Sequence, residues 1–336
     1  MKIPWHVKPY EFQLRDPFGL SRGTRRSVRN LFIRIGEGWG EGAPVYYRGQ
    51  TIQAMESMAL EWLESPLPLD RPIQEIMREV EERYPGETAF WQAVDLALHD
   101  HWGKKNGAPI RTLWNYKPSP LLSSFTIGMD DLDAVMQKVE KAASHPILKI
   151  KVGGERDLET LRAIHQRTKK KLYVDANEGW SYEQALEYLP LMREWGVQLI
   201  EQPLPGGDFE NYRRLHEANR TGVPIILDES VHGPEDIESW IGRADGINIK
   251  LAKCGGLTRA RRMLDIARKN GMQVMLGCMI ESSLGIAAAA QLASEADFLD
   301  LDGAALVSND PFSGLSFQDG VLILSNDPGF GVTPSF

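Results

Sequence analysis

Eight short apolar segments recur between residues 120 and 302, and most of them end on a polar side chain. The residues that end these segments are spaced by about 24 to 27 positions: Thr126, Lys151, Asp175, Glu201, Asp228, Lys253, Gly277 and Asp302. Amphipathic helical patterns lie between the segments, and this alternation predicts βα units with a parallel sheet. Eight such units predict a (β/α)₈-type barrel. Because barrel enzymes place their chemistry at the carboxyl ends of the strands, we expect these end residues to share one site.

The first 115 residues do not follow this rhythm. The stretch RNLFIRIGEGWGEG is typical of strands joined by glycine turns, and the segments 51–64, 72–84 and 87–107 have helical patterns. We therefore predict an α+β capping domain over residues 1–115 and a barrel over residues 116–309. The segment 310–336, which contains the strand-like VLILS, is predicted to complete the cap.

Composition excludes several classes of function. A net charge of -8 argues against a protein that binds nucleic acid through a basic surface. No apolar run approaches the roughly 20 residues needed to cross a bilayer, and the first residues lack the apolar core of a signal peptide. Two cysteines are too few for a disulfide framework. We expect a cytoplasmic protein that acts on a small molecule, and the sequence leaves its oligomeric state open, a homo-oligomer included.

Three consecutive strand ends carry carboxylates, Asp175 in VDANEGW, Glu201 in IEQPLP and Asp228 in LDES. Three carboxylates at one barrel mouth repel one another strongly unless a cation lies among them. Oxygen ligands suit Mg²⁺, whereas zinc would favour histidine or cysteine, and neither residue type ends a segment. The sequence therefore predicts a magnesium site. The alternative is three separate surface or helix-capping acids.

Two lysine pairs face each other in this arrangement. Lys149 and Lys151 lie two positions apart in ILKIKVGG and so share one face of a strand, while INIKLAKCGG offers Lys250 and Lys253. A lysine near a metal and a second ammonium group is biased towards the neutral amine, a general base. If the metal stabilises an enediolate, a base on each side can remove an α-proton and return it on the other. This layout indicates a racemase or epimerase; the alternative is solvated or ion-paired lysines.

At this point the motifs match a known family. DAN, EQP and DES, with KIK and KLAKCGG, resemble the muconate-lactonizing subgroup of the enolase superfamily, and GWGEGAP, FWQAVDLALHDHWGKKNGAPI and GCMIESSLGIAAAA extend the resemblance over nearly the whole chain. The resemblance implies a modified TIM barrel, (β/α)₇β, with an N-terminal α+β capping domain. It also implies Mg²⁺ at the three strand-end carboxylates and acid/base roles for Lys151 and Lys253. Lys149 and Lys250 would then be supporting residues.

The reaction within this subgroup depends on DFLDLDGAAL. Asp300 and Asp302 alternate on the eighth segment, so both acceptors face the same way and suit a substrate ammonium group. This D-x-D is similar to that of the dipeptide epimerases, where it binds the free α-amino group; Thr126 is assigned to the same substrate-binding set. The alternative reactions in this subgroup are those of o-succinylbenzoate synthase, a cycloisomerase or an N-acylamino-acid racemase. The alternative role for the D-x-D pair is that of an ordinary acidic strand end.

A basic segment in the cap, FGLSRGTRRSV, is expected to be a loop that closes over the substrate. Its SRGTR resembles the loop of the L-Ala-D/L-Glu epimerases, which implies that Arg25 meets the side-chain carboxylate of a glutamate residue; the alternative is a solvated loop. The prediction is an Mg²⁺-dependent epimerase that inverts the C-terminal residue of an L-Xaa-L/D-Yaa dipeptide. L-Ala-D/L-Glu, a dipeptide from peptidoglycan recycling, is the first candidate. The alternative from another functional class is a catalytically silent barrel that only binds a metal or a peptide.

Overall fold

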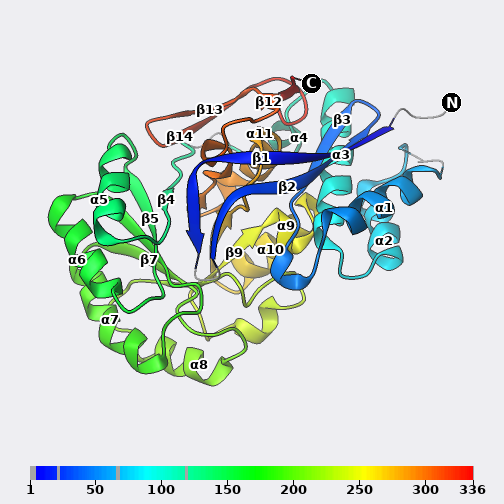
Figure 1. Cartoon of the computed structure of the whole chain (residues 1–336). Coiled ribbons are helices and arrows are strands. Elements are labelled where there is room, and N and C mark those ends of the chain that lie inside the picture. Colours follow the sequence, from blue (N-terminus) through cyan, green and yellow to red (C-terminus); the bar gives the residue numbers. More distant parts are fainter. Residues whose placement is uncertain (1–4, 21–22, 66–68, 118–119, 336) are drawn as a thin grey trace.

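The computed structural model describes residues 5–20, 23–65, 69–117 and 120–335. Its centre is an eight-stranded sheet in which every strand pairs in parallel with its neighbour in chain order (Figure 1). The strands are β4 (Phe125–Ile127), β5 (Ile147–Lys151), β6 (Lys171–Asp175), β7 (Val197–Glu201), β8 (Ile225–Leu227), β9 (Gly246–Lys250), β10 (Gln273–Gly277) and β11 (Phe298–Asp300). The Ser124 amide donates to Leu299 O at 3.0 Å and joins the two ends of the sheet. The predicted barrel is confirmed.

Helices cover the outside of the barrel, between successive strands: α5 (Leu132–Lys141), α6 (Asp157–Arg167), α7 (Tyr182–Glu194), α8 (Phe209–Ala218), α10 (Leu257–Lys269) and α11 (Ser283–Ala290). Several begin at side chains that bond the first free amide groups, as Ser181 does in a capping box with Gln184. Between β8 and β9 the structure has a short 3₁₀ helix, η2 (Ile237–Trp240), in place of an α-helix.

The cap is an antiparallel sheet packed on helices. Its strands are β1 (Trp5–Leu20), β2 (Gly23–Ile35) and β3 (Gly38–Gly42), and its helices are α1 (Ile52–Leu63), α2 (Ile73–Arg83) and α3 (Thr88–Lys105). The alternate glycines of β3 face α3, because a Cβ at Gly40 would lie 1.9 Å from Ala93 O. The intervening side chains, Trp39 and Glu41, therefore point the other way.

The β1–β2 hairpin extends from the cap towards the barrel (Figure 1, dark blue) and meets the segment that follows β11. Leu14 forms a bridge with Val307, and the Ser308 amide donates to Gln13 O at 2.9 Å. This hairpin corrects one expectation, because Arg25, Arg26 and Arg29 lie on strand β2 rather than in a loop.

The C-terminal segment contacts both parts of the chain. It contains β12 (Phe312–Ser313), β13 (Leu315–Gln318), β14 (Val321–Leu324) and β15 (Thr333–Pro334). The Phe330 amide donates to Asp100 Oδ1 on α3 at 3.0 Å, whereas the Leu322 amide donates to Leu121 O just before the barrel. The domain boundaries at residues 115 and 309 stay predictions. In the described part of the chain, no helix is both long and apolar enough to span a bilayer.

Candidate active site

The strand ends of the barrel and one face of the cap enclose a cavity of about 360 Å³. Barrel side chains in its wall include Thr126, Lys149, Lys151, Asn177, Asp228, Glu229, Lys250, Cys278, Met279, Ile280, Asp300, Asp302 and Leu306. The cap contributes Arg25, Val28, Asn30, Ala43, Pro44, Val45, Tyr46 and Tyr47. The cavity therefore lies between the two parts of the chain, and most of the site residues predicted from the sequence meet there.

Asp175, Glu201 and Asp228 come from three adjacent strands and are all buried. Asp175 and Glu201 end β6 and β7, and Asp228 directly follows β8. Burial alone would raise the pKa of Asp175, but the ammonium groups of Lys149 and Lys151 outweigh it and hold that pKa at about 2. Burial, reinforced by the Asp175 charge, raises the pKa of Glu201 to about 7. The three carboxylates are therefore crowded enough to need compensating positive charge.

Lysine ammonium groups supply that charge in this structure. Lys149 Nζ lies 2.9 Å from Asp175 Oδ2 and 2.7 Å from Glu201 Oε2. Glu201 Oε2 is buried and accepts no hydrogen bond of good geometry, while Asn248 Nδ2 donates to Oε1 at 2.8 Å. Among the described residues no three acidic, histidine or cysteine side chains already have the geometry of a metal site. The donor set nevertheless fits Mg²⁺, since it consists of buried carboxylate oxygens, one of them without a hydrogen bond.

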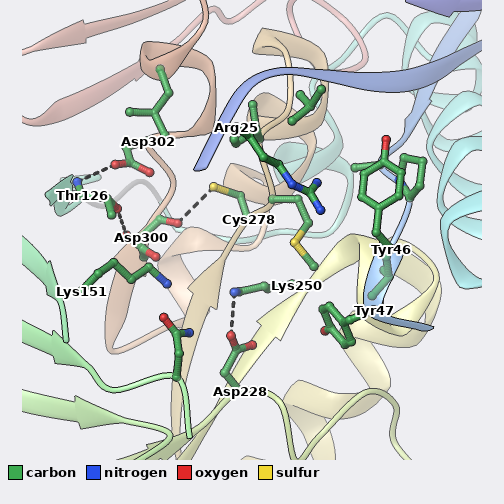
Figure 2. A pocket seen from close by; sticks show the side chains of 18 of the residues that line it. Arg25, Tyr46, Tyr47, Thr126, Lys151, Asp228, Lys250, Cys278, Asp300 and Asp302 are labelled. Atoms are coloured by element: carbon green, nitrogen blue, oxygen red, sulfur yellow. Dashed lines mark hydrogen bonds and ion pairs between the residues drawn. The ribbon is translucent and has the colours of Figure 1, made fainter. Parts of the chain in front are cut away.

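Lys151 and Lys250 enter the cavity from opposite sides. Lys151 ends β5 and Lys250 ends β9, and these strands lie four positions apart in an eight-stranded barrel. Figure 2 shows their amino groups on the two sides of the cavity, with Asp300 and Thr126 beside Lys151. Lys151 Nζ contacts Asp175 Oδ2 at 2.6 Å, and Lys250 Nζ contacts Asp228 Oδ2 at 2.7 Å. Two amines thus flank one space, each next to a carboxylate.

Lys253 is not part of the cavity wall. The prediction that it ends the sixth strand is wrong, because β9 stops at Lys250 and the short helix α9 (Leu251–Cys254) begins at the next residue. The Lys253 side chain is 1% exposed and donates to the Asp228 carbonyl, to Asp228 Oδ1 and to Val231 O. Its ammonium group therefore holds the segment from Asp228 to Val231, which follows β8.

Lys149 lies one layer below Lys151, as two residues apart on a strand require. It is 1% exposed and bridges carboxylates, with Asp300 Oδ2 also at 2.7 Å. Burial opposes its ammonium form, but Asp175, Asp300 and Glu201 outweigh burial and raise its pKa well above the usual value. The contacts of Lys149 thus favour its charged form.

Asp300 and Asp302 lie side by side at the cavity wall and are both buried. Ser124 Oγ donates to Asp300 Oδ1 at 2.6 Å, and the Thr126 amide donates to Asp302 Oδ2 at 2.7 Å. Burial and the Asp300 charge raise the pKa of Asp302 to about 7, whereas the Lys149 charge overcomes burial and lowers the pKa of Asp300. The two side chains therefore place hydrogen-bond acceptors together in the cavity wall (Figure 2).

Arg25 reaches the cavity from the cap, and its guanidinium lies 4.6 Å from the centre of the Tyr46 ring (Figure 2). Of the other arginines in the basic segment, Arg22 lies outside the described residues, and Arg26 and Arg29 are on β2 but not in the cavity wall. Among the described arginines of this segment, Arg25 is therefore the one that lines the cavity.

Sequence reasoning missed several cavity residues. Asn177 and Glu229 are near strand-end carboxylates in DAN and DES, and Asn177 Nδ2 donates to Glu229 Oε1 at 3.1 Å. Their position next to the acids was a usable signal. Asn30, Tyr47 and the segment Cys278–Ile280 had no such signal, because the cavity wall they form depends on how the cap docks on the barrel.

The family of the chain follows from comparison with known proteins. Residues 131–335 match the model of the enolase C-terminal domain-like family. An L-Ala-D/L-Glu epimerase from Bacteroides thetaiotaomicron is 36% identical over 336 residues, which cover 96% of this chain and 86% of the relative. The chain belongs to the dipeptide epimerases of the enolase superfamily. The expected modified TIM barrel with a capping domain is thereby confirmed.

Solved structures of other dipeptide epimerases resemble the whole chain. A substrate-liganded complex of the L-Ala-D/L-Glu epimerase from Bacillus subtilis has a TM-score of 0.93 and 28% identity, and covers 99% of both chains. The dipeptide epimerase from Methylococcus capsulatus, complexed with Mg and L-Arg-D-Lys, has a TM-score of 0.91 and 31% identity, again over 99% of both chains. The Bacillus relative is thus named for L-Ala-D/L-Glu, whereas the Methylococcus relative is complexed with a dipeptide of two basic residues.

Proposed function

We propose that this chain inverts the α-carbon of the C-terminal residue of a dipeptide by moving a proton between two lysines. The observation that carries the proposal is the pair Lys151 and Lys250, which flank one cavity from opposite strands. In this proposal Lys250 takes the role that the sequence suggested for Lys253, because the Lys253 amine is buried against Asp228 and Val231. Family membership supports the reaction class.

The lysines act as an acid and a base in turn. One amine removes the α-proton, and the ammonium group on the opposite side returns a proton to the other face of the carbon. Lys149 stays charged and shares the carboxylate oxygen Asp175 Oδ2 with Lys151, so a fixed positive charge lies beside the proposed base.

Asp175, Glu201 and Asp228 are the residues that would hold Mg²⁺, and relatives are complexed with this ion. When bound, the ion supplies positive charge for the substrate carboxylate as negative charge builds up on it during proton removal. The three carboxylates come from β6, β7 and β8, the strands between β5 and β9, and would therefore hold that charge near both lysines.

Asp300 and Asp302 are proposed to bind the free ammonium group of the N-terminal residue, with Thr126 holding Asp302 through its amide. A substrate without an amine would meet only repulsion from this pair, which argues against the muconate and o-succinylbenzoate reactions.

Arg25 is proposed to contact an acidic side chain on the C-terminal residue. L-Ala-D/L-Glu is therefore the first substrate to test, in line with the Bacteroides relative. We further propose that the protein acts in peptidoglycan recycling and that it is cytoplasmic. The free thiols of Cys254 and Cys278 support a reducing, cytoplasmic location.

The test is incubation of dipeptides in D₂O with Mg²⁺, followed by NMR. We expect deuterium at the second α-carbon and formation of the other epimer, fastest with L-Ala-L-Glu or L-Ala-D-Glu. Lys151→Ala should stop exchange of one epimer and formation of the other while Mg²⁺ binding persists, which separates an enzyme from a binding barrel. Failure of a broad dipeptide library to exchange would reject the proposed function.

A further inference from the structure

The segment that follows β10 forms part of the cavity wall but takes its shape from the cap. Cys278, Met279 and Ile280 line the cavity, and Glu281 and Ser282 continue into helix α11. We call residues 278–282 the β10 loop. Its main-chain polar groups leave the sheet at this point, so their hydrogen bonds must come from elsewhere. Side chains of the cap supply several of them.

Asn30 of β2 is the first of these contacts. It is 2% exposed and lies in the cavity wall. Its amide nitrogen donates to Ile280 O at 3.0 Å and to Glu41 Oε1 at 2.8 Å. A single cap side chain therefore holds the carbonyl of a cavity residue, 250 positions away in the sequence.

Glu41 of β3 is the second contact, and it is fully buried. Burial and the Glu281 charge raise the pKa of this group to about 8. Its carboxyl oxygens accept from the Ser282 amide at 3.0 Å, from Ser282 Oγ at 2.5 Å and from the Gly285 amide at 3.0 Å. These donors lie at the start of α11, whose first amides need acceptors. Glu41 reaches them because the glycine face of β3 packs on α3 and turns Glu41 towards the barrel.

Glu281 of the loop completes the connection from the other side. Its Oε1 accepts from the Met279 amide at 3.0 Å, and its Oε2 accepts from Gln92 Nε2 at 2.8 Å. Gln92 lies on α3, and its Oε1 accepts from the amide of Ala43, a further cavity residue. The cap thus holds the β10 loop at Ile280, Glu281 and Ser282.

We propose that Asn30 and Glu41 are positioning residues that hold the β10 loop against the cap and so set which C-terminal side chains the cavity accepts. Arg25 and Val28 line the cavity from the same strand as Asn30. The same strand therefore carries Arg25 and Asn30, and both side chains line the cavity. The inference rests on the proposed function, since it concerns the dipeptide cavity.

Two variants test the inference. Asn30→Ala removes the hydrogen bonds to Ile280 O and Glu41 Oε1. Glu41→Gln keeps the shape of the side chain but places an amide NH₂ group among N–H donors. Dissociation constants of L-Ala-L-Glu and L-Ala-L-Leu are measured by calorimetry, and KM and kcat by exchange in D₂O. We expect each variant to raise KM and the dissociation constant for L-Ala-L-Glu about 10-fold, with kcat within about 2-fold. The ratio between the two dipeptides should change, and the double variant should add little to either single one.

Asp95→Asn is the matched control, because Asp95 also joins the cap to the barrel, through Thr258, but is not in the cavity wall. It should lower Tm without changing KM or the ratio between the dipeptides. Folded Asn30→Ala and Glu41→Gln proteins with unchanged dissociation constants and ratio would overturn the inference. Wild-type protein that binds dipeptides but exchanges none would reject the proposed function, while its binding ratios would still decide the role of Asn30.

Discussion

Lys250 and Lys253 make different contacts with Asp228, and methionine substitutions distinguish their roles. Lys250→Met removes one ion pair and leaves Asp228 paired with Lys253. If Lys250 is a base, proton removal from one configuration falls about 10³-fold. The opposite configuration still exchanges its α-proton through Lys151. The expected signature is therefore loss of exchange from one epimer only.

Lys253→Met should behave differently. Lys253 is 1% exposed and donates to two carbonyls and a carboxylate, so solvent does not screen the contacts that are lost. Leaving these buried acceptors without a partner should lower the free energy of unfolding by about 3 kcal/mol. Asp228 would shift, and exchange from both epimers should fall by the same factor.

The assay follows initial rates of deuterium uptake by L-Ala-L-Glu and L-Ala-D-Glu in separate samples, at saturating Mg²⁺, with urea unfolding for stability. Lys151→Met is the mirror control and should stop exchange of the epimer that Lys250→Met leaves active. The reasoning is refuted if Lys253→Met stops one epimer only while Lys250→Met slows both equally.

Three further outcomes are expected. Glu201→Gln should weaken Mg²⁺ binding at least about 10-fold by calorimetry, because a neutral amide replaces a buried carboxylate ligand; unchanged affinity would remove Glu201 from the metal site. Arg25→Met should lower kcat/KM for L-Ala-L-Glu about 10- to 100-fold and leave L-Ala-L-Leu nearly unchanged, since only the first loses a charge-assisted contact. The pKa of Asp302 is raised to about 7, so its charged form is lost as pH falls through 7; KM should rise below that pH, and Asp302→Asn should abolish this dependence.

Much of the fold could be predicted because its determinants are local. The period of apolar segments marks the barrel strands, and β5, β6, β7 and β10 end at the residues expected from the spacing. Asp228 and Asp302 follow their strands by one and two residues, which still keeps them at the mouth. Spacing therefore locates a strand end to within about three residues, slightly more than the uncertainty usual for element boundaries.

The same tolerance explains the misplaced lysine. Lys250 and Lys253 are three positions apart, and the regular spacing favoured Lys253. A helix starting at Leu251 turns the chain, so these three positions separate a cavity residue from a buried one. Asn30 and Glu41 could not be found by any local pattern, because their partners Ile280 and Ser282 are brought to them only by the docking of the cap.

The contacts of Asp228 also suggest an order of events. Both of its oxygens are paired, Oδ1 with Lys253 and Oδ2 with Lys250. A divalent cation that binds Asp228 must compete with one of these ammonium groups.

Lys253 has two backbone carbonyls that hold it in place, whereas Asp228 is the one hydrogen-bond partner of Lys250 among the described residues. In this structure the Asp228 charge outweighs burial and raises the pKa of Lys250. We therefore expect Lys250 to be the group that Mg²⁺ would displace, and loss of the Asp228 contact would lower that pKa. Calorimetry of Mg²⁺ binding in buffers of different ionisation enthalpy should detect proton release, to which Glu201 also contributes because its pKa is raised to about 7. Lys250→Met should reduce this release and Lys253→Met should retain it; equal release from all three proteins would contradict this order.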